Sequence, residues 1–94
     1  MQIGTLRMSL FLRQARSLKD KRSVVKSFKD RLRARFNVSV AEVGQQDAWQ
    51  TATLGVTLIS TEAGHADQVL AKVVGFIESG WPDIQLLDYQ VEIM

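Results

Sequence analysis

The chain has 94 residues, of which 46% are hydrophobic and 23% are charged, with a formal net charge of +2. This length predicts one domain with a single hydrophobic core, and the composition is that of an ordinary globular protein. Cysteine is absent, which excludes disulfides and thiolate chemistry and favours a cytoplasmic protein. The first residues lack the continuous apolar core of a signal peptide, and no apolar run is long enough to span a membrane.

A half-buried strand is predicted over residues 2–13, because apolar and polar side chains alternate there. Its expected inward face comprises Gly4, Leu6, Met8, Leu10 and Leu12. A helix is predicted over about 18–35, capped by Ser17, with Asp20 three residues later as in a capping box. Its apolar stripe comprises Leu18, Val25, Phe28, Leu32 and Phe36.

Two more strands, a second helix and a last strand follow. A strand over 37–43, a hairpin loop over 44–48 and a strand over 49–60 precede a helix that we expect Thr61 to cap. Gly80 ends that helix, and the last strand covers 84–93, with Leu87, Tyr89, Val91 and Ile93 on its apolar face. The βαββαβ order predicts a ferredoxin-like α+β fold, with strand order 4-1-3-2 and both helices on one face of the sheet.

Three motifs carry a resemblance to a known family. They are SLKDKR at 17–22, RFNVSVAEV at 35–43 and DAWQ at 47–50, and they resemble the small bacterial YlxP-like family over essentially the whole chain. The resemblance implies a ferredoxin-like fold and a bacterial cytoplasmic protein. That family is a domain of unknown function, so the resemblance implies no catalytic residues. Genes of the family often lie near genes for ribosome maturation and translation initiation.

Charge is distributed unevenly along the chain. Residues 1–36 hold eleven basic and two acidic residues, a net charge of +9, whereas residues 37–94 hold one basic and eight acidic residues, a net charge of −7. Such asymmetry indicates a polyanionic partner or electrostatically guided self-association. A solvated helix whose charges are matched by its neighbours would give the same count.

The first predicted helix carries five basic residues at spacings of three and four, which we call the basic ridge. They lie within 80° of one another on a helical wheel, beside the apolar stripe, and span about 20 Å. The basic ridge comprises Lys19, Arg22, Lys26, Lys29 and Arg33. Such a ridge fits the phosphate backbone of a nucleic acid and is our candidate surface for RNA or the ribosome. The alternative is a solvated face whose aliphatic stems cover the edge of the core.

Lys21 falls near the centre of the apolar stripe, where an ammonium group needs a carboxylate or a path to water. Glu42 interrupts the apolar side of the second strand. We therefore expect a buried ion pair between Lys21 and Glu42, with a ligand-anchoring lysine as the alternative.

The uncovered face of the sheet is the second candidate surface. On the first and third strands, Phe11 is the only aromatic residue of this face. The face therefore lacks the base-stacking pattern of RNA-recognition motifs. A flat, modestly apolar face favours packing on a second subunit, with Arg7, Phe11, Thr57 and Ile59 as candidate interface residues. We expect Arg7 to pair with Asp88 or Glu92 on the neighbouring strand.

No catalytic, cofactor or metal site is predicted. His65 is the one histidine, and it and two nearby acids do not make a metal site. Residues 13–17 (RQARS) contain arginines but no glycine, which leaves an acylphosphatase-like hydrolase as a weak alternative. Trp49 and Trp81 border loops and fit partly buried lids or binding anchors. The sequence therefore favours a non-enzymatic homo-oligomeric module, with an RNA- or ribosome-associated factor as the alternative.

Overall fold

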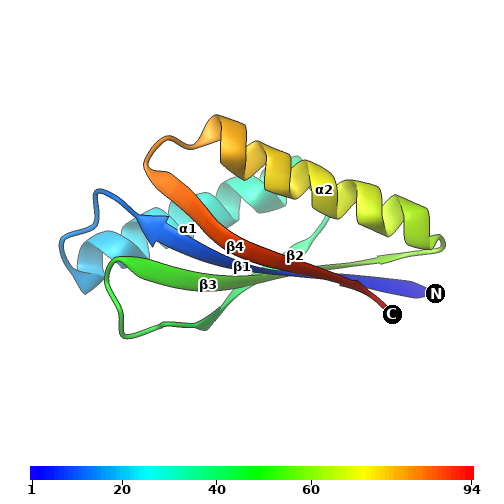
Figure 1. The fold of residues 1–94 in the computed structure, drawn as a ribbon, viewed down its shortest axis with the longest axis horizontal. Coiled ribbons are helices and arrows are strands. Elements are labelled where there is room, and N and C mark those ends of the chain that lie inside the picture. Colours follow the sequence, from blue (N-terminus) through cyan, green and yellow to red (C-terminus); the bar gives the residue numbers. More distant parts are fainter.

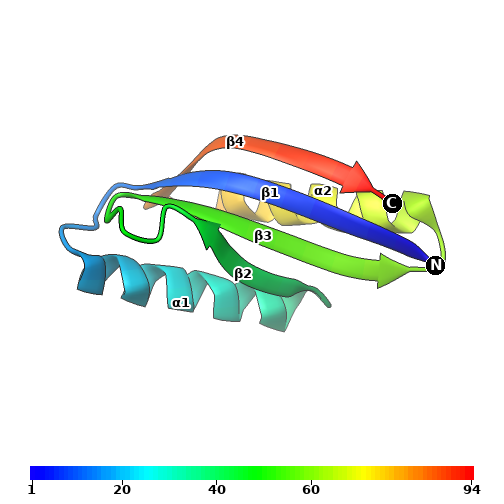
Figure 2. The ribbon, with the colours of Figure 1, turned by 90° about the horizontal axis from the view of Figure 1, so that it is seen from below.

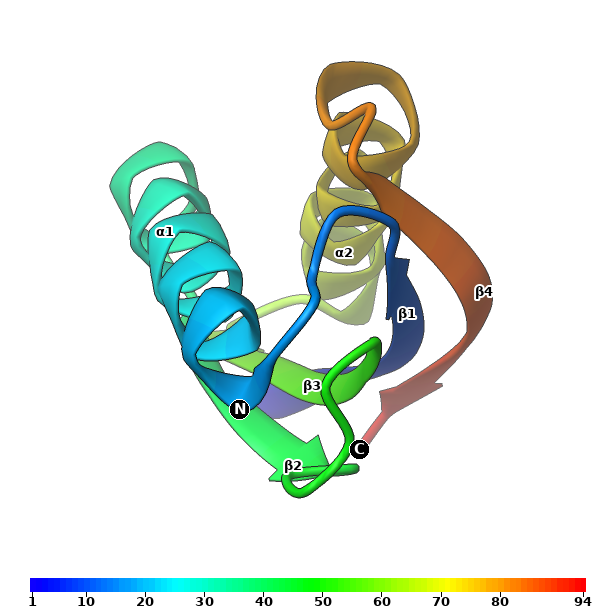
Figure 3. The ribbon, with the colours of Figure 1, turned by 90° about the vertical axis from the view of Figure 1, so that its left-hand side faces the viewer.

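Four strands form one antiparallel sheet in the order β2-β3-β1-β4, and two helices cover the same face of it (Figure 1). The computed structural model describes residues 1–94. The elements are β1 (Gln2–Leu12), α1 (Leu18–Arg35), β2 (Ser39–Gly44), β3 (Thr51–Ser60), α2 (Ala63–Gly80) and β4 (Ile84–Ile93). The predicted α+β ferredoxin-like architecture is confirmed, and seen end-on the sheet keeps one face free of helices (Figure 3).

The core lies between the sheet and the helices because alternate strand residues point toward the helices. Leu6, Met8, Leu10 and Leu12 of β1 are each at most 1% exposed. Together with inward residues of β3 and the apolar stripes of both helices they form one cluster of 19 buried residues. The buried side chains recur at every second position of the strands and at every third or fourth position of the helices. These are the positions that the predicted periodicities place inward.

The two helices differ in how their first turns are capped. The Ser17 hydroxyl accepts a hydrogen bond from the Asp20 amide at 3.1 Å, and the Asp20 carboxylate accepts one from the Arg16 amide at 3.1 Å. Ser17 is thus the predicted cap, but the carboxylate bonds the Arg16 amide, whereas in a capping box it would bond the amide of the cap residue itself. The cap of α2 is Glu62 rather than Thr61, and its side chain makes no capping hydrogen bond.

β4 departs from simple alternation. Leu10 pairs with Leu86 while Ser9 pairs with Asp88, so Leu87 is the extra residue of a β-bulge. The prediction that Leu87 shares a face with Tyr89 was therefore wrong, because the bulge shifts the alternation by one residue. Leu87 is 53% exposed.

The β2–β3 hairpin lies beside α1, and the chain termini lie close together at the opposite end of the sheet (Figure 2). Both hairpin strands are shorter than predicted, since β2 begins at Ser39 and β3 at Thr51. The residues from 45 to 50 instead form a loop that turns back toward the first turn of α1, where Lys21 holds it.

Candidate interaction surfaces on the sheet and on helix α1

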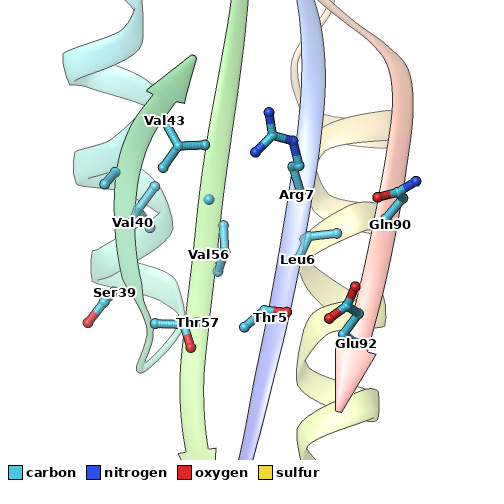
Figure 4. Close-up of a pocket in the computed structure, with 12 residues that line it drawn as sticks. Thr5, Leu6, Arg7, Ser39, Val40, Val43, Val56, Thr57, Gln90 and Glu92 are labelled. Atoms are coloured by element: carbon cyan, nitrogen blue, oxygen red, sulfur yellow. The ribbon is translucent and has the colours of Figure 1, made fainter. Parts of the chain in front are cut away.

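The uncovered face of the sheet is hollowed at its centre (Figure 4). The hollow has a volume of about 450 Å³, and residues from all four strands line it. Gly55 leaves its floor without a side chain, and a methyl group of Val43 lies 3.2 Å from the place where a Cβ of residue 55 would stand. The face is therefore concave rather than flat, with small and hydroxyl-bearing residues over most of its area.

Arg7 stands on β1 at this hollow and has no charged partner within the chain. The three ion pairs of the protein involve Lys21, Lys26 and Arg33. The predicted pairing of Arg7 with Asp88 or Glu92 is wrong, because the residue directly opposite Arg7 on β4 is Gln90. Both acids are diagonal neighbours, and the Arg7 guanidinium extends away from Glu92 (Figure 4).

The other three candidate interface residues differ in how much surface they offer. Ile59 is 67% exposed, whereas Phe11 and Thr57 are half-buried. The Thr57 hydroxyl donates a hydrogen bond to the carbonyl oxygen of Gly4 at 2.9 Å. Ile59 is thus the residue of this face whose apolar surface is most open to a partner.

Both free edges of the sheet are protected against the addition of another strand. On β2, the Arg33 guanidinium donates to the carbonyl oxygen of Val40 at 2.7 Å. On β4, the amide of Tyr89 donates to the Asp88 carboxylate at 2.8 Å, next to the bulge. Side chains that occupy edge groups, and bulges, are the usual obstacles to edge-to-edge pairing.

Lys21 is 1% exposed, and its ammonium group lies 2.9 Å from a carboxylate oxygen of Glu42. The same ammonium donates to the carbonyl oxygens of Gln45 and Ala48, the latter at 2.6 Å. Two of its three hydrogens therefore have backbone acceptors, and Glu42 supplies the counter-ion, although its buried Oε2 has no hydrogen-bond partner. The two carbonyl partners were missed by sequence reasoning because backbone acceptors have no residue signature.

The five residues of the basic ridge lie along the flank of α1 that faces β2. Lys26 is 2.9 Å from Asp30, and Arg33 contacts both Asp30 at 3.6 Å and the β2 edge. The hydrogen bond from Lys26 holds the pKa of Asp30 below its usual value. Of the ridge, Lys19, Arg22 and Lys29 have no carboxylate partner.

The opposite flank of α1 carries two arginines that lie over aromatic rings, an arrangement that sequence reasoning missed. The Arg31 guanidinium lies 4.9 Å from the ring centre of Trp81, and that of Arg35 lies 5.1 Å from the ring centre of Phe76. Trp81 also meets Phe28 edge-to-face at 4.9 Å. The spacing of four residues between the two arginines was visible in the sequence, but their aromatic partners come from the far end of α2 and the loop after it.

The loop after β1 does not present a phosphate-binding geometry. The Arg16 and Asp20 amides at the start of α1 are already bonded to side chains of the same turn. No group of three or more histidine, cysteine or acidic residues lies close enough to hold a metal ion. Neither helix is long and apolar enough to cross a membrane.

Comparison with known proteins identifies the family. The family described as "Protein of unknown function (DUF503)" matches residues 3–91. The chain belongs to the DUF503 family. A relative in Bacillus subtilis (strain 168), the "Uncharacterized protein YlxP", is 36% identical over 83 residues, which cover 88% of this chain and 89% of that protein. The predicted YlxP-like family is thereby confirmed.

Two designed proteins share the fold of this DUF503 chain. The de novo designed protein LFR1 1 with ferredoxin fold has a TM-score of 0.56 at 12% identity, covering 100% of this chain and 84% of that one. The de novo designed protein Ferredog-Diesel has a TM-score of 0.52 at 10% identity, covering 96% and 83%. At such low identity these matches show the ferredoxin-like fold alone.

Proposed function

We propose that the protein is an interaction module that associates with a second copy of itself through the uncovered face of its sheet. The observation that carries this proposal is the unpaired Arg7 at the centre of that face. The protected edges on Val40 and Tyr89 support a face-to-face contact, since they disfavour pairing by strand addition. No catalytic activity is part of the proposal.

The area of the face suits a dimer of ordinary size. Four strands about 4.8 Å apart, three of them ten or eleven residues long and β2 six, give a flat footprint on the order of 600 Å². A standard interface buries about 800 Å² of accessible surface per partner, and a rough surface has more accessible area than its footprint. The face is therefore large enough for a specific contact, with Ile59 as its most exposed apolar residue.

The charges on the face are self-complementary. Arg7 and Glu92 lie on neighbouring strands, two residues apart in register, and neither has an ion-pair partner within the chain. A two-fold axis between them brings Arg7 of each copy over Glu92 of the other, as an isologous interface requires. Sheets packed about 10 Å apart leave a distance that these two long side chains span.

Sedimentation equilibrium of the purified protein tests the proposal. We expect a dimer at micromolar concentration and a monomer for Ile59→Lys, which places a charge on the most exposed apolar residue of the contact. Tyr89→Lys is the matched control, because Tyr89 is 48% exposed but pairs with the inward residue Met8 and so lies on the helix side of the sheet. A wild-type monomer at these concentrations would refute self-association.

Exchange of the two charges tests the orientation of the dimer. Arg7→Glu and Glu92→Arg should each weaken the dimer, because each places like charges opposite one another, and the double variant should recover most of the loss. A double variant as weak as the single variants would exclude the Arg7–Glu92 contact while leaving the face itself in place.

A second function, RNA or ribosome binding, is favoured by the three cations of the basic ridge that lack carboxylates. Co-sedimentation with ribosomal subunits and bulk RNA over a salt series measures it, since phosphate contacts weaken linearly in log salt. Arg22→Glu and Lys29→Glu should reduce binding, whereas Lys72→Glu on α2 should not. Equal binding by all three variants would exclude the ridge.

A further inference from the structure

We propose that the flank of α1 opposite the basic ridge binds single-stranded nucleic acid by stacking unpaired bases on two arginines. The surface, which we call the arginine shelf, comprises Arg31, Arg35, Phe36, Phe76 and Trp81. It lies on the helix side of the molecule, so it does not depend on the sheet-face dimer. It also differs from the ridge in chemistry, because it combines planar cations with aromatic rings.

The rings hold the two guanidinium groups in place. Arg31 lies 4.9 Å from the centre of Trp81, and Arg35 lies 5.1 Å from Phe76 and 6.0 Å from Phe36. Cation–π contacts of this kind occur when a guanidinium is within about 6 Å of the ring centre. The rings in turn are fixed edge-to-face, Phe36 against Phe76 at 5.9 Å and Phe76 against Trp81 at 6.5 Å.

Neither guanidinium forms an ion pair or a hydrogen bond within the protein. Arg31 and Arg35 take part in none of the three ion pairs and in none of the side-chain hydrogen bonds. Both are exposed, and a shallow hollow of about 520 Å³ lies over them, lined also by Ala34 and Phe76. The planar groups of both arginines and their N–H donors are therefore available to a ligand.

A nucleotide strand matches both open features. Unpaired bases stack on arginine planes as they do on aromatic rings, and arginine N–H edges bind phosphate in a bidentate manner. An unpaired base would stack on the guanidinium, which itself lies on an aromatic ring, while the phosphate would accept hydrogen bonds from the guanidinium N–H groups. An acidic peptide would satisfy the charge but would leave the planar surface unused.

Replacement of both arginines by lysine separates stacking from charge. Lys keeps the positive charge but has no planar group and no bidentate fork. In a Trp49→Phe background, Trp81 is the single tryptophan, and its fluorescence reports on the shelf. The titrants are a 12-nucleotide oligouridylate, a 12-base-pair RNA duplex, and inorganic polyphosphate as a polyanion without bases.

We expect the oligouridylate to change Trp81 emission and to bind more tightly than the duplex or polyphosphate at equal charge. The double lysine variant should bind it at least about fivefold more weakly, the lower end of the range for one stacked base, with a smaller loss of polyphosphate affinity. Equal affinity of the lysine variant and its parent for oligouridylate would overturn the proposal. The proposal would also be overturned if polyphosphate, the duplex or a polyglutamate peptide bound as tightly as the oligouridylate.

Ala34→Glu is a second variant that leaves the aromatic rings untouched. It places a carboxylate beside both arginines at an exposed helix position and should abolish the Trp81 response. An unchanged response would exclude the shelf. The ridge variant Arg22→Glu/Lys29→Glu should keep the Trp81 response. If this variant loses the response and the double lysine variant keeps it, binding belongs to the ridge instead.

Discussion

Replacement of Lys21 by Met should destabilise the protein far more than loss of an ordinary surface lysine. Lys21 is 1% exposed, and its removal leaves the Glu42 carboxylate without its counter-ion and two loop carbonyls without their donor. Removing one partner of a buried ion pair typically costs about 3–5 kcal/mol. The Glu42 side chain is 21% exposed and can be partly hydrated, so we expect about 3 kcal/mol.

Urea unfolding followed by circular dichroism measures this loss. Lys29→Met is the matched control, since Lys29 has no ion-pair partner, and it should change the free energy of unfolding by less than about 0.5 kcal/mol. Lys21→Met/Glu42→Leu should be more stable than Lys21→Met alone, because it removes the uncompensated carboxylate.

Hydrogen exchange adds a local readout of the same contact. The Ala48 amide, which donates to the Gln45 carbonyl at 3.1 Å, should exchange faster in Lys21→Met because the loop has lost its anchor. A loss below about 1 kcal/mol with unchanged exchange at Ala48 would refute the view that Lys21 organises the hairpin loop.

Three further predictions concern the helix start, the sheet–helix contact and pH. Ser17→Ala removes the side-chain cap of α1 and should cost about 1 kcal/mol in urea unfolding, against no change for Ser27→Ala. Gly4→Val should destabilise by about 1–3 kcal/mol, because a Cβ at residue 4 would already lie 3.1 Å from Leu70; a neutral effect would mean that α2 shifts freely. Asp30 has its pKa lowered from 3.8, so its pairing with Lys26 stabilises the fold above that pH and is lost as the pH falls through the lowered value. The small stability difference between the parent and Lys26→Met should therefore be present at pH 7 and diminish as the pH falls below 3.8, and a difference that stays constant over that range would contradict the pairing.

The strand and helix patterns were predictable because they depend on local periodicity. The alternation in β1 placed Leu6 and Met8 inward, and the Ser17–Asp20 spacing marked the start of α1. Lys21 was recognisable as an anomaly because it interrupts an apolar stripe, and Glu42 was recognisable for the same reason on a strand. Each of these signals lies within one element.

Other features depend on how separate elements meet. The register of β4 against β1 places Arg7 opposite Gln90 rather than an acid, and the bulge at Leu87 shifts that register by one residue between Ser9 and Leu10. The carbonyl partners of Lys21 have no sequence signature, because every residue carries one.

By itself, the sequence determined the order of the elements, the apolar face of each, the family, and the excess of positive charge on α1. Only the tertiary structure decided which charges remain free. Arg33 is used at the β2 edge and Arg31 is held on Trp81, while Arg7 is left unpaired in a hollow. The physical reason is that a charge is neutralised by whatever lies within a few ångströms of it, and for residues far apart in the chain that is set by packing and register.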